Sequence, residues 1–250
     1  MSFYTRVKNI AIAEATNYEK VYIDYEYLVF VSDFKGKYYI IAGTDKNYLH
    51  LVGVHTTLDK ETFFAKCKAG ELDESDFEFI DNDGKDIKGT VRRKIQVLGN
   101  MTKLMEQGNL YVQEQFKKNR VICSLGATDS VCTMGFIKSS NRQNAKAFPK
   151  TLMKGNELKN PKKVELLLRR KSGHEKFDGI VIGNRELVRE HFEELKAVVA
   201  VSLYSDVDNC RNMKFLNKEI GVYKNTKTPV CFRANTYSEK IKRIKLRNKR

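Results

Sequence analysis

The 250-residue chain has few of the patterns that mark common catalytic or metal sites. Its four histidines and five scattered cysteines form neither a paired CxxC site nor an HExxH motif, the two most recognisable metal-binding patterns. A Walker A loop, a dinucleotide-binding glycine fingerprint and a Ser or Cys hydrolase signature are also missing. We therefore expect no bound metal or cofactor.

Long apolar stretches are missing as well. No run of 18 apolar residues occurs, and the first 15 residues lack the apolar segment of a signal peptide, so we expect no membrane span. The odd number of cysteines is typical of reduced thiols in a cytoplasmic protein. Only three prolines and 41% hydrophobic residues indicate a globular chain.

Positive charge is in excess and is unevenly distributed. The chain has 46 Lys and Arg against 31 Asp and Glu, a net charge of +15. Residues 57–86 are acidic, whereas residues 138–176 and the last twelve residues are strongly basic. Such segregation suits a polyanionic partner, because neutralising phosphates releases counterions. A solvated basic face with a solubility tail is the alternative interpretation.

The apolar pattern predicts an α+β organisation. We expect helices over 3–15, 58–69 (capped by Thr57), 91–107 and 186–198, and a hairpin whose second strand spans 37–42. Three short strands over 110–137, with one turn at 117–119 and another at 126–129, predict an antiparallel meander, and a hairpin follows over 164–182. Further strands are expected over 199–203 and 229–232. The predicted organisation is an α+β domain over 1–182, an accessory segment over 183–238 and a basic tail over 239–250.

One histidine stands out by its position. His50 follows a buried strand and the exit turn Gly43-Thr44-Asp45, inside the apolar phrase YLHLVGV. An imidazole titrates near neutrality, so a position just beyond a central strand suits an acid/base residue. A packed histidine that caps a backbone group is the alternative. His55 is a weaker candidate, and His174 and His191 are expected at the surface.

A basic segment after a predicted strand offers groups that bind phosphate. Arg142 and Lys150 could clamp a phosphate and Thr151 could orient it, with His50 as base or acid. This is the inventory that metal-free RNA cleavage needs, although a basic loop that binds phosphate without chemistry has the same composition. Arg92, Arg93 and Lys94 could line the same cleft, but solvent exposure is the commoner fate of such charges.

Several phrases resemble the phage-associated Barnase–EndoU–Colicin–RelE-like nucleases, in particular their fourth subgroup. The most specific is YYIIAGTDKNYLHLVGV at 38–54, followed by FFAKCKAGEL at 63–72. The remaining matches are RRKIQVLGNMTKLM at 92–105, VICSLG at 121–126, TMGFI at 133–137 and FPKTLMKG at 148–155. The resemblance covers about residues 20 to 182.

The resemblance implies helices packed on a twisted antiparallel sheet, followed here by a C-terminal accessory segment. It also implies metal-independent RNA cleavage, and an association with phages and mobile elements in toxin or host-takeover roles. His50 would be the leading active-site residue, Lys150 and Thr151 the second, and Arg142 the third.

The resulting expectation is a metal-independent endoribonuclease whose partners are RNA or ribonucleoprotein, with a possible protein antidote or host-defence target. Two alternatives stay open: a catalytically inactive binder of RNA or ribonucleoprotein on the same fold, such as an inhibitor of host defence, and a DNA-binding accessory protein. The expected nucleic-acid contacts are Lys138, Arg142, Lys146, Lys154, Arg169, Arg170, Lys242, Arg243, Lys245 and Arg247.

Overall fold

A computed structural model of the chain describes residues 1–34, 38–106 and 108–205. The residues from Met1 to Tyr204 form one compact unit, which contains every helix and strand of the described residues. The expected strand at 229–232 and the basic tail lie outside the described residues.

Helices and strands occur in mixed order along the unit. The helices are α1 (Phe3–Tyr18), α2 (Asp45–Val52), α3 (Lys60–Ala69), α4 (Lys88–Ile95), α5 (Asn100–Lys103), α6 (Arg185–Glu190) and α7 (Phe192–Leu195). The first strands are β1 (Tyr25–Phe30), β2 (Tyr38–Ile41), β3 (Tyr111–Glu114), β4 (Lys117–Lys118), β5 (Val121–Ile122) and β6 (Leu125–Thr128). The later strands are β7 (Cys132–Lys138), β8 (Lys146–Lys154), β9 (Lys162–Lys163), β10 (Leu166–Lys171) and β11 (Gly179–Ile182). None of the described helices has both the length and the apolar character that a membrane crossing requires.

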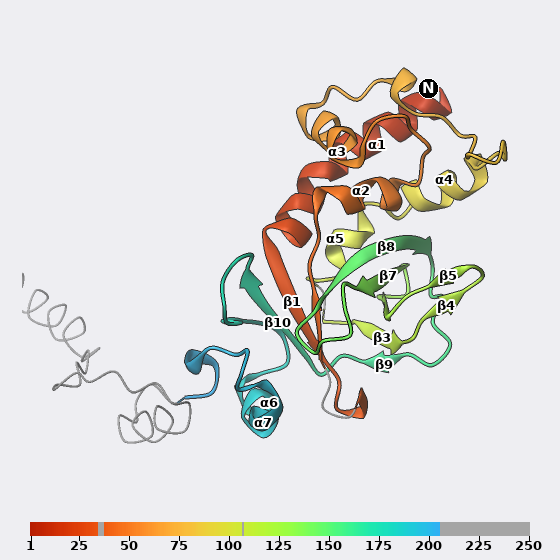
Figure 1. Ribbon diagram of the computed structural model, residues 1–250. Coiled ribbons are helices and arrows are strands. Elements are labelled where there is room, and N and C mark those ends of the chain that lie inside the picture. The colour runs from red at the N-terminus through yellow and green to blue at the C-terminus, as the bar shows by residue number, and fades with distance from the viewer. Residues whose placement is uncertain (35–37, 107, 206–250) are drawn as a thin grey trace, which may run out of the picture. The chain divides into compact units, whose positions relative to one another are not determined.

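Nine strands form one large curled sheet in the order β11-β10-β1-β2-β8-β7-β6-β3-β9. All neighbouring pairs are antiparallel except β2 and β8. Between β9 and β10, Val164 donates to the Leu110 carbonyl at 2.9 Å, and Glu165 donates to the Phe30 carbonyl at 3.2 Å. This segment therefore hydrogen-bonds both to the chain just before β3 and to β1, which are far apart in the strand order. Figure 1 shows α1 to α4 gathered at one end of it. The α+β fold class expected from the sequence is confirmed.

Buried tyrosines fix α2 against α1. Tyr48 is fully buried, and its hydroxyl donates to the Ala11 carbonyl of α1 at 2.6 Å. Tyr18, also fully buried, donates to the Thr44 carbonyl just before α2 at 2.9 Å. Because a buried hydroxyl without a partner is destabilising, these two bonds hold both halves of α2 in place.

The hairpin of β1 and β2 and the β10–β11 hairpin occur as expected, and β3, β6 and β7 form an antiparallel meander. The turn expected at 117–119 was wrong, because Lys117–Lys118 form β4, which pairs with β5 in a separate two-stranded sheet. The helix expected over 91–107 was wrong as a continuous element, because α4 ends at Ile95 and α5 begins at Asn100. Val97 and Leu98 are adjacent and both buried. Neighbouring residues of a helix point about 100° apart, so a series of turns buries both side chains more readily than a single helical face does.

Four other local predictions were wrong. Residues 126–128, expected in a turn, belong to strand β6, and the turn follows at Asp129, whose carboxylate accepts from the backbone of Val131 and Cys132. Asp59, not Thr57, caps α3. Residues 201–203 form a short 3-10 helix where a strand was expected, and the helix expected over 186–198 is divided at His191.

The segment after β11 packs against the unit as far as Tyr204. Phe177 donates to the Val198 carbonyl and accepts from the Ala200 amide, both at 2.8 Å. Arg189 donates to the Tyr204 carbonyl at 3.0 Å. The boundary expected at 182/183 falls between β11 and α6, whereas the compact unit continues to Tyr204.

Candidate active site

The turn after β2 directs the chain into α2. Ala42 donates to Ala147 of β8, after which α2 lies beside the rest of β8 in place of a strand. At Gly43 a Cβ atom would lie 2.6 Å from the Tyr18 hydroxyl oxygen, so only glycine fits this close approach. The Asn47 side chain accepts from the Thr44 amide at 2.9 Å and begins the helix. This arrangement places His50 in the last turn of α2.

The end of α2 is built around Gly53 and Lys94. Gly53 has φ of 80° and ends the helix. A Cβ atom at Gly53 would lie 2.5 Å from Cδ of Lys94 and 2.9 Å from its Nζ. The Lys94 ammonium donates a hydrogen bond to the carbonyl oxygen of His50. Burial lowers the pKa of Lys94 to about 8. Gly53 is therefore needed both for its conformation and for the space that Lys94 occupies.

Lys150 is displayed by an irregularity in β8. In the pairing of β7 with β8, Thr151 lies opposite Gly135 and Pro149 lies opposite Phe136. Lys150 is thus the extra residue of a β-bulge, a feature that re-aims side chains and is common beside active sites. Its side chain is exposed, and its charge acts on both His50 and Cys123. Lys150 is thus close enough to α2 for its charge to act on His50.

These elements surround His50 with positive charge. Burial lowers the pKa of His50 to about 4, and the charges of Lys60, Lys150 and Lys94 add to the effect. The imidazole is therefore neutral at pH 7 and can accept a proton. A bound phosphate would offset the lysine charges and bring the pKa back toward neutrality.

Thr151 and Arg142 occupy different surroundings from those of Lys150. Thr151 is buried, and its methyl group is 3.0 Å from where a Cβ at Gly135 would lie. Arg142 is exposed in the loop between β7 and β8. Lys146 begins β8, and four residues of strand, about 13 Å, separate it from Lys150. The structure thus brings His50 and Lys150 together, and Arg142 is not among the cations that act on His50.

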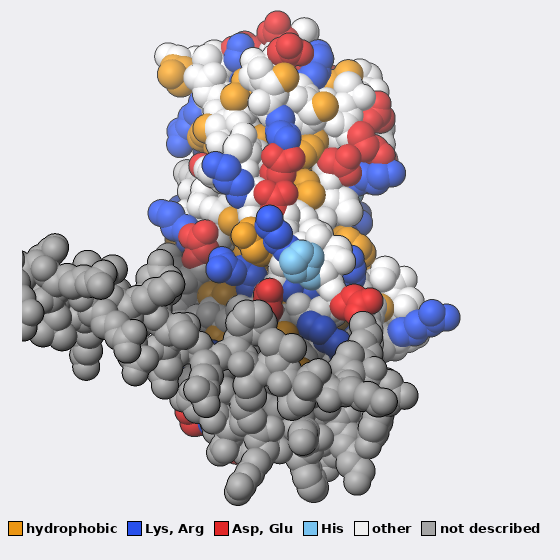
Figure 2. Space-filling view, turned by 90° about the vertical axis from the view of Figure 1, so that its left-hand side faces the viewer, with side chains coloured by type: hydrophobic (Ala, Val, Ile, Leu, Met, Phe, Trp, Pro, Cys, Tyr) orange, Lys and Arg blue, Asp and Glu red, His pale blue; other side chains and the backbone are white. Residues whose placement is uncertain are grey.

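Many of the expected nucleic-acid contacts already have protein partners. Lys146 and Arg170 both pair with the buried carboxylate of Glu26, at 2.5 and 2.6 Å. Lys138 and Arg169 lie over the rings of Tyr39 and Tyr25, and Lys154 donates to Gln96 at 3.0 Å. In Figure 2, Lys and Arg side chains alternate with Asp and Glu and with hydrophobic side chains. Lys242, Arg243, Lys245 and Arg247 lie outside the described residues.

The other three histidines lie in different environments. His55 Nε2 is 3.6 Å from a Glu78 carboxylate oxygen, and the His191 ring packs against the Phe30 ring at a tilt of 46°, with centroids 4.5 Å apart. His174 is exposed in the turn between β10 and β11. Within the described part of the chain, His50 is thus the histidine on which three lysine charges converge.

Thiol and metal chemistry find little support among the described residues. Cys67, Cys123 and Cys132 are free and buried, and burial raises the pKa of each thiol, to about 12 for Cys67 and about 11 for Cys123. Such thiols stay protonated and are poor nucleophiles. No group of three or more His, Cys, Asp or Glu side chains in the described ranges is placed to hold a metal ion.

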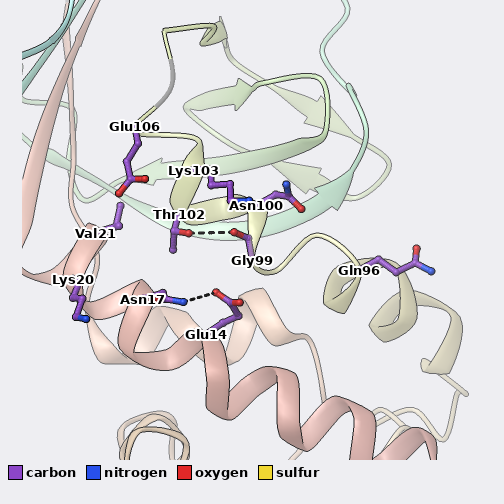
Figure 3. Close-up of a pocket in the computed structure, with 10 residues that line it drawn as sticks. All are labelled: Glu14, Asn17, Lys20, Val21, Gln96, Gly99, Asn100, Thr102, Lys103 and Glu106. Carbon is purple, nitrogen blue, oxygen red and sulfur yellow. Dashed lines mark hydrogen bonds between the residues drawn. The ribbon is translucent and has the colours of Figure 1, made fainter.

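A separate hollow of about 450 Å³ lies between α1 and the chain around α5. Figure 3 shows its polar lining, with Asn17 donating to Glu14 at 3.1 Å and Thr102 donating to the Gly99 carbonyl at 3.2 Å. It contains none of the site residues expected from the sequence. Gln96, on its rim, contacts Lys154 and so lies at the far end of β8 from Lys146.

Two site lysines were missed or misjudged from the sequence. Lys94 is partly buried against α2, although solvent exposure was the favoured expectation for it; Arg92 and Arg93 are exposed. The signal available was its place directly before Ile95, at the border of the apolar face of α4. Lys60 was not considered, and no local pattern marks it, because it approaches His50 only through the packing of α3 on α2.

Comparison with known proteins gives one match. The family model described as phage-Barnase-EndoU-ColicinE5/D-RelE like nuclease4 matches residues 11–185, well over half of the chain. No curated protein and no solved structure matches the chain. The matched range includes α2, α4 and β8, and therefore His50, Lys94 and Lys150.

Proposed function

Because the chain belongs to the family of phage-Barnase-EndoU-ColicinE5/D-RelE like nucleases, fourth group, we propose that it is an endoribonuclease that needs no metal. The observation that carries the proposal is the neutral imidazole of His50 among Lys60, Lys94 and Lys150. A neutral imidazole supplies a base, and clustered ammonium groups supply the charge stabilisation that phosphate chemistry needs.

In the proposed reaction, His50 removes the proton from a ribose 2′-hydroxyl. The 2′-oxygen then bonds to the adjacent phosphorus, and the bond from phosphorus to the 5′-oxygen of the next nucleotide breaks. The leaving oxygen takes up a proton from solvent water, and the products are a 2′,3′-cyclic phosphate and a 5′-hydroxyl. His50 gains one proton, which is returned to solvent after release.

The lysines act on the charge that develops at phosphorus. Lys150, exposed on its bulge, is the cation best placed to contact a non-bridging phosphate oxygen. Lys94 is held by its bond to the His50 carbonyl, so its charge is fixed before substrate binds. Fixed charge of this kind stabilises a transition state without reorganisation during the reaction.

The chemical identity of the products tests the proposal. A short RNA and the same RNA with a single 2′-deoxy nucleotide at the cleaved position are incubated with the protein, and the product ends are identified by mass spectrometry. We expect a 2′,3′-cyclic phosphate from the first and no cleavage of the second. Products with a 5′-phosphate, or equal cleavage of the deoxy substrate, would overturn it.

A further inference from the structure

A groove of about 860 Å³ near His50 has no part in the proposed cleavage step. It lies between the π-helical turn Glu19–Ile23 that follows α1, the start of β1, the start of α2, one side of α3 and the start of β8. Its apolar lining residues are Ile23, Ala42, Phe64, Ala65, Ala69 and Phe148. Apolar and aromatic side chains with a few polar groups are typical of small-molecule sites.

The two aromatic rings in the groove differ in what they can offer a ligand. Phe64 is buried among tyrosines, with its ring centroid 5.3 Å from that of Tyr48. Phe148 is only partly buried and lies on β8 opposite the exposed Ile137. Phe148 is therefore the ring on which a planar ligand can stack.

The charges of the groove favour a neutral ligand with hydrogen-bond donors. The lining includes four carboxylates, from Glu19, Glu26, Asp45 and Glu61, but only two lysines, Lys68 and Lys146. These lysines already pair with Glu19 and Glu26. Arg170 also pairs with Glu26, and Lys46 pairs with Glu61, so the groove offers a phosphate no excess of positive charge. The carboxylate oxygens can still accept hydrogen bonds from the N–H groups of a nucleobase.

Three elements run from the groove to His50. On α2, Asp45 lines the groove and His50 lies five residues later, a rise of about 7.5 Å. On β8, Phe148 lines the groove and Lys150 follows two residues later, about 7 Å along the strand. On α3, Glu61 lines the groove, and the neighbouring Lys60 acts on His50. The groove and the lysine cluster are therefore built on the same three elements.

We propose that this groove binds one base of the RNA, stacked on Phe148, while Lys150 holds the phosphate attached to the same nucleotide. The proposal rests on the ribonuclease function for the position of the phosphate. The hollow of Figure 3 has no aromatic lining and offers no such stacking surface. Among the four bases, uracil has the fewest N–H donors and is expected to bind most weakly.

The test fills the groove without disturbing the core. Ala65 lines the groove and is exposed on α3, so Ala65→Leu projects into the groove. Ala13 is exposed on α1 and lines neither the groove nor the hollow of Figure 3, so Ala13→Leu is the matched control. Phe148→Leu removes the stacking ring at similar size. Binding of the four nucleoside 3′-monophosphates is measured by calorimetry, which requires no cleavage.

We expect Ala65→Leu and Phe148→Leu to weaken binding at least tenfold and to remove the preference against uridine 3′-monophosphate, with Ala13→Leu unchanged. If the wild-type protein and all three variants bind the nucleotides equally tightly, the groove proposal is overturned. Groove-dependent binding by a protein that cleaves no RNA would support the groove and overturn the ribonuclease function, so the two failures are distinguishable.

Discussion

Lys94 on α4 donates a hydrogen bond to the carbonyl oxygen of His50 on α2, and Gly53 provides the space for it. The contact joins two helices that are 44 residues apart in the sequence at this point. It holds a positive charge close enough to His50 to lower the pKa of the imidazole. The protonation of His50 and the fold of this region are therefore coupled.

The charge of Lys150 should be visible in the titration of His50. Removing it in Lys150→Ala should raise the pKa of His50 above about 4, because one of the charges that disfavour the imidazolium is then absent. Arg142→Ala is the matched control and should leave that pKa unchanged. The measurement is an NMR titration of the histidine ring protons, with the His50 signal assigned from its absence in His50→Gln. Equal shifts in both variants would contradict the geometry of the site.

The pH dependence of cleavage should have two limbs. The kcat/KM should rise as the pH increases through about 4, because His50 of the free protein must lose its proton to act as a base. It should fall above about 8, where Lys94 becomes neutral and the site loses a positive charge. Lys94→Met should remove the second limb. A profile that rises only near pH 6.5 would indicate that the pKa of His50 is not lowered by its surroundings.

Gly53 should tolerate alanine less well than Gly70, although both end helices with positive φ. A left-handed alanine costs about 1–2 kcal/mol. At Gly70 a Cβ has no atom within 4 Å, so Gly70→Ala should lose only that amount. Gly53→Ala should lose more free energy of unfolding, because the Cβ also displaces Lys94. Denaturant unfolding of the two variants measures the difference, and equal losses would contradict the described packing.

The basic tail should add affinity without base preference. Deleting residues 239–250 removes seven basic residues and one acidic residue. Each phosphate that the tail neutralises should add about 0.7 to the slope of log K against log salt for single-stranded RNA, so the deletion should make that slope shallower. Because phosphate contacts carry no sequence information, the order of preference among RNA sequences should not change. An unchanged slope would assign the salt dependence to residues 138–176.

The sequence predicted much of this molecule where local patterns decide the structure. The strand at Tyr38–Ile41, the exit at Gly43 and the helix at Phe3–Tyr18 follow from apolar periodicity and glycine positions. The break between α4 and α5 did not, since Leu98 continues the apolar face of Val91 and Ile95 and only tertiary packing buries Val97 as well.

The site was predicted in part for the same reason. His50 and Lys150 were both named, because each lies in a distinctive phrase. Their proximity depends on the bulge in β8 and on the packing of α2 beside that strand. No local sequence pattern predicts either feature. Lys60 and Lys94 reach His50 only through helix packing, so the full cation cluster required the structure.

The most direct test of the central claim is cleavage of RNA by the wild-type protein and by His50→Ala, each with and without EDTA. We expect wild-type cleavage to be unaffected by the chelator, and His50→Ala to lose about 100-fold or more in rate while binding RNA as before, the loss expected for a general base. His174→Ala, at an exposed turn, is the control and should cleave normally. Cleavage that EDTA abolishes, or that survives in His50→Ala, would contradict the account.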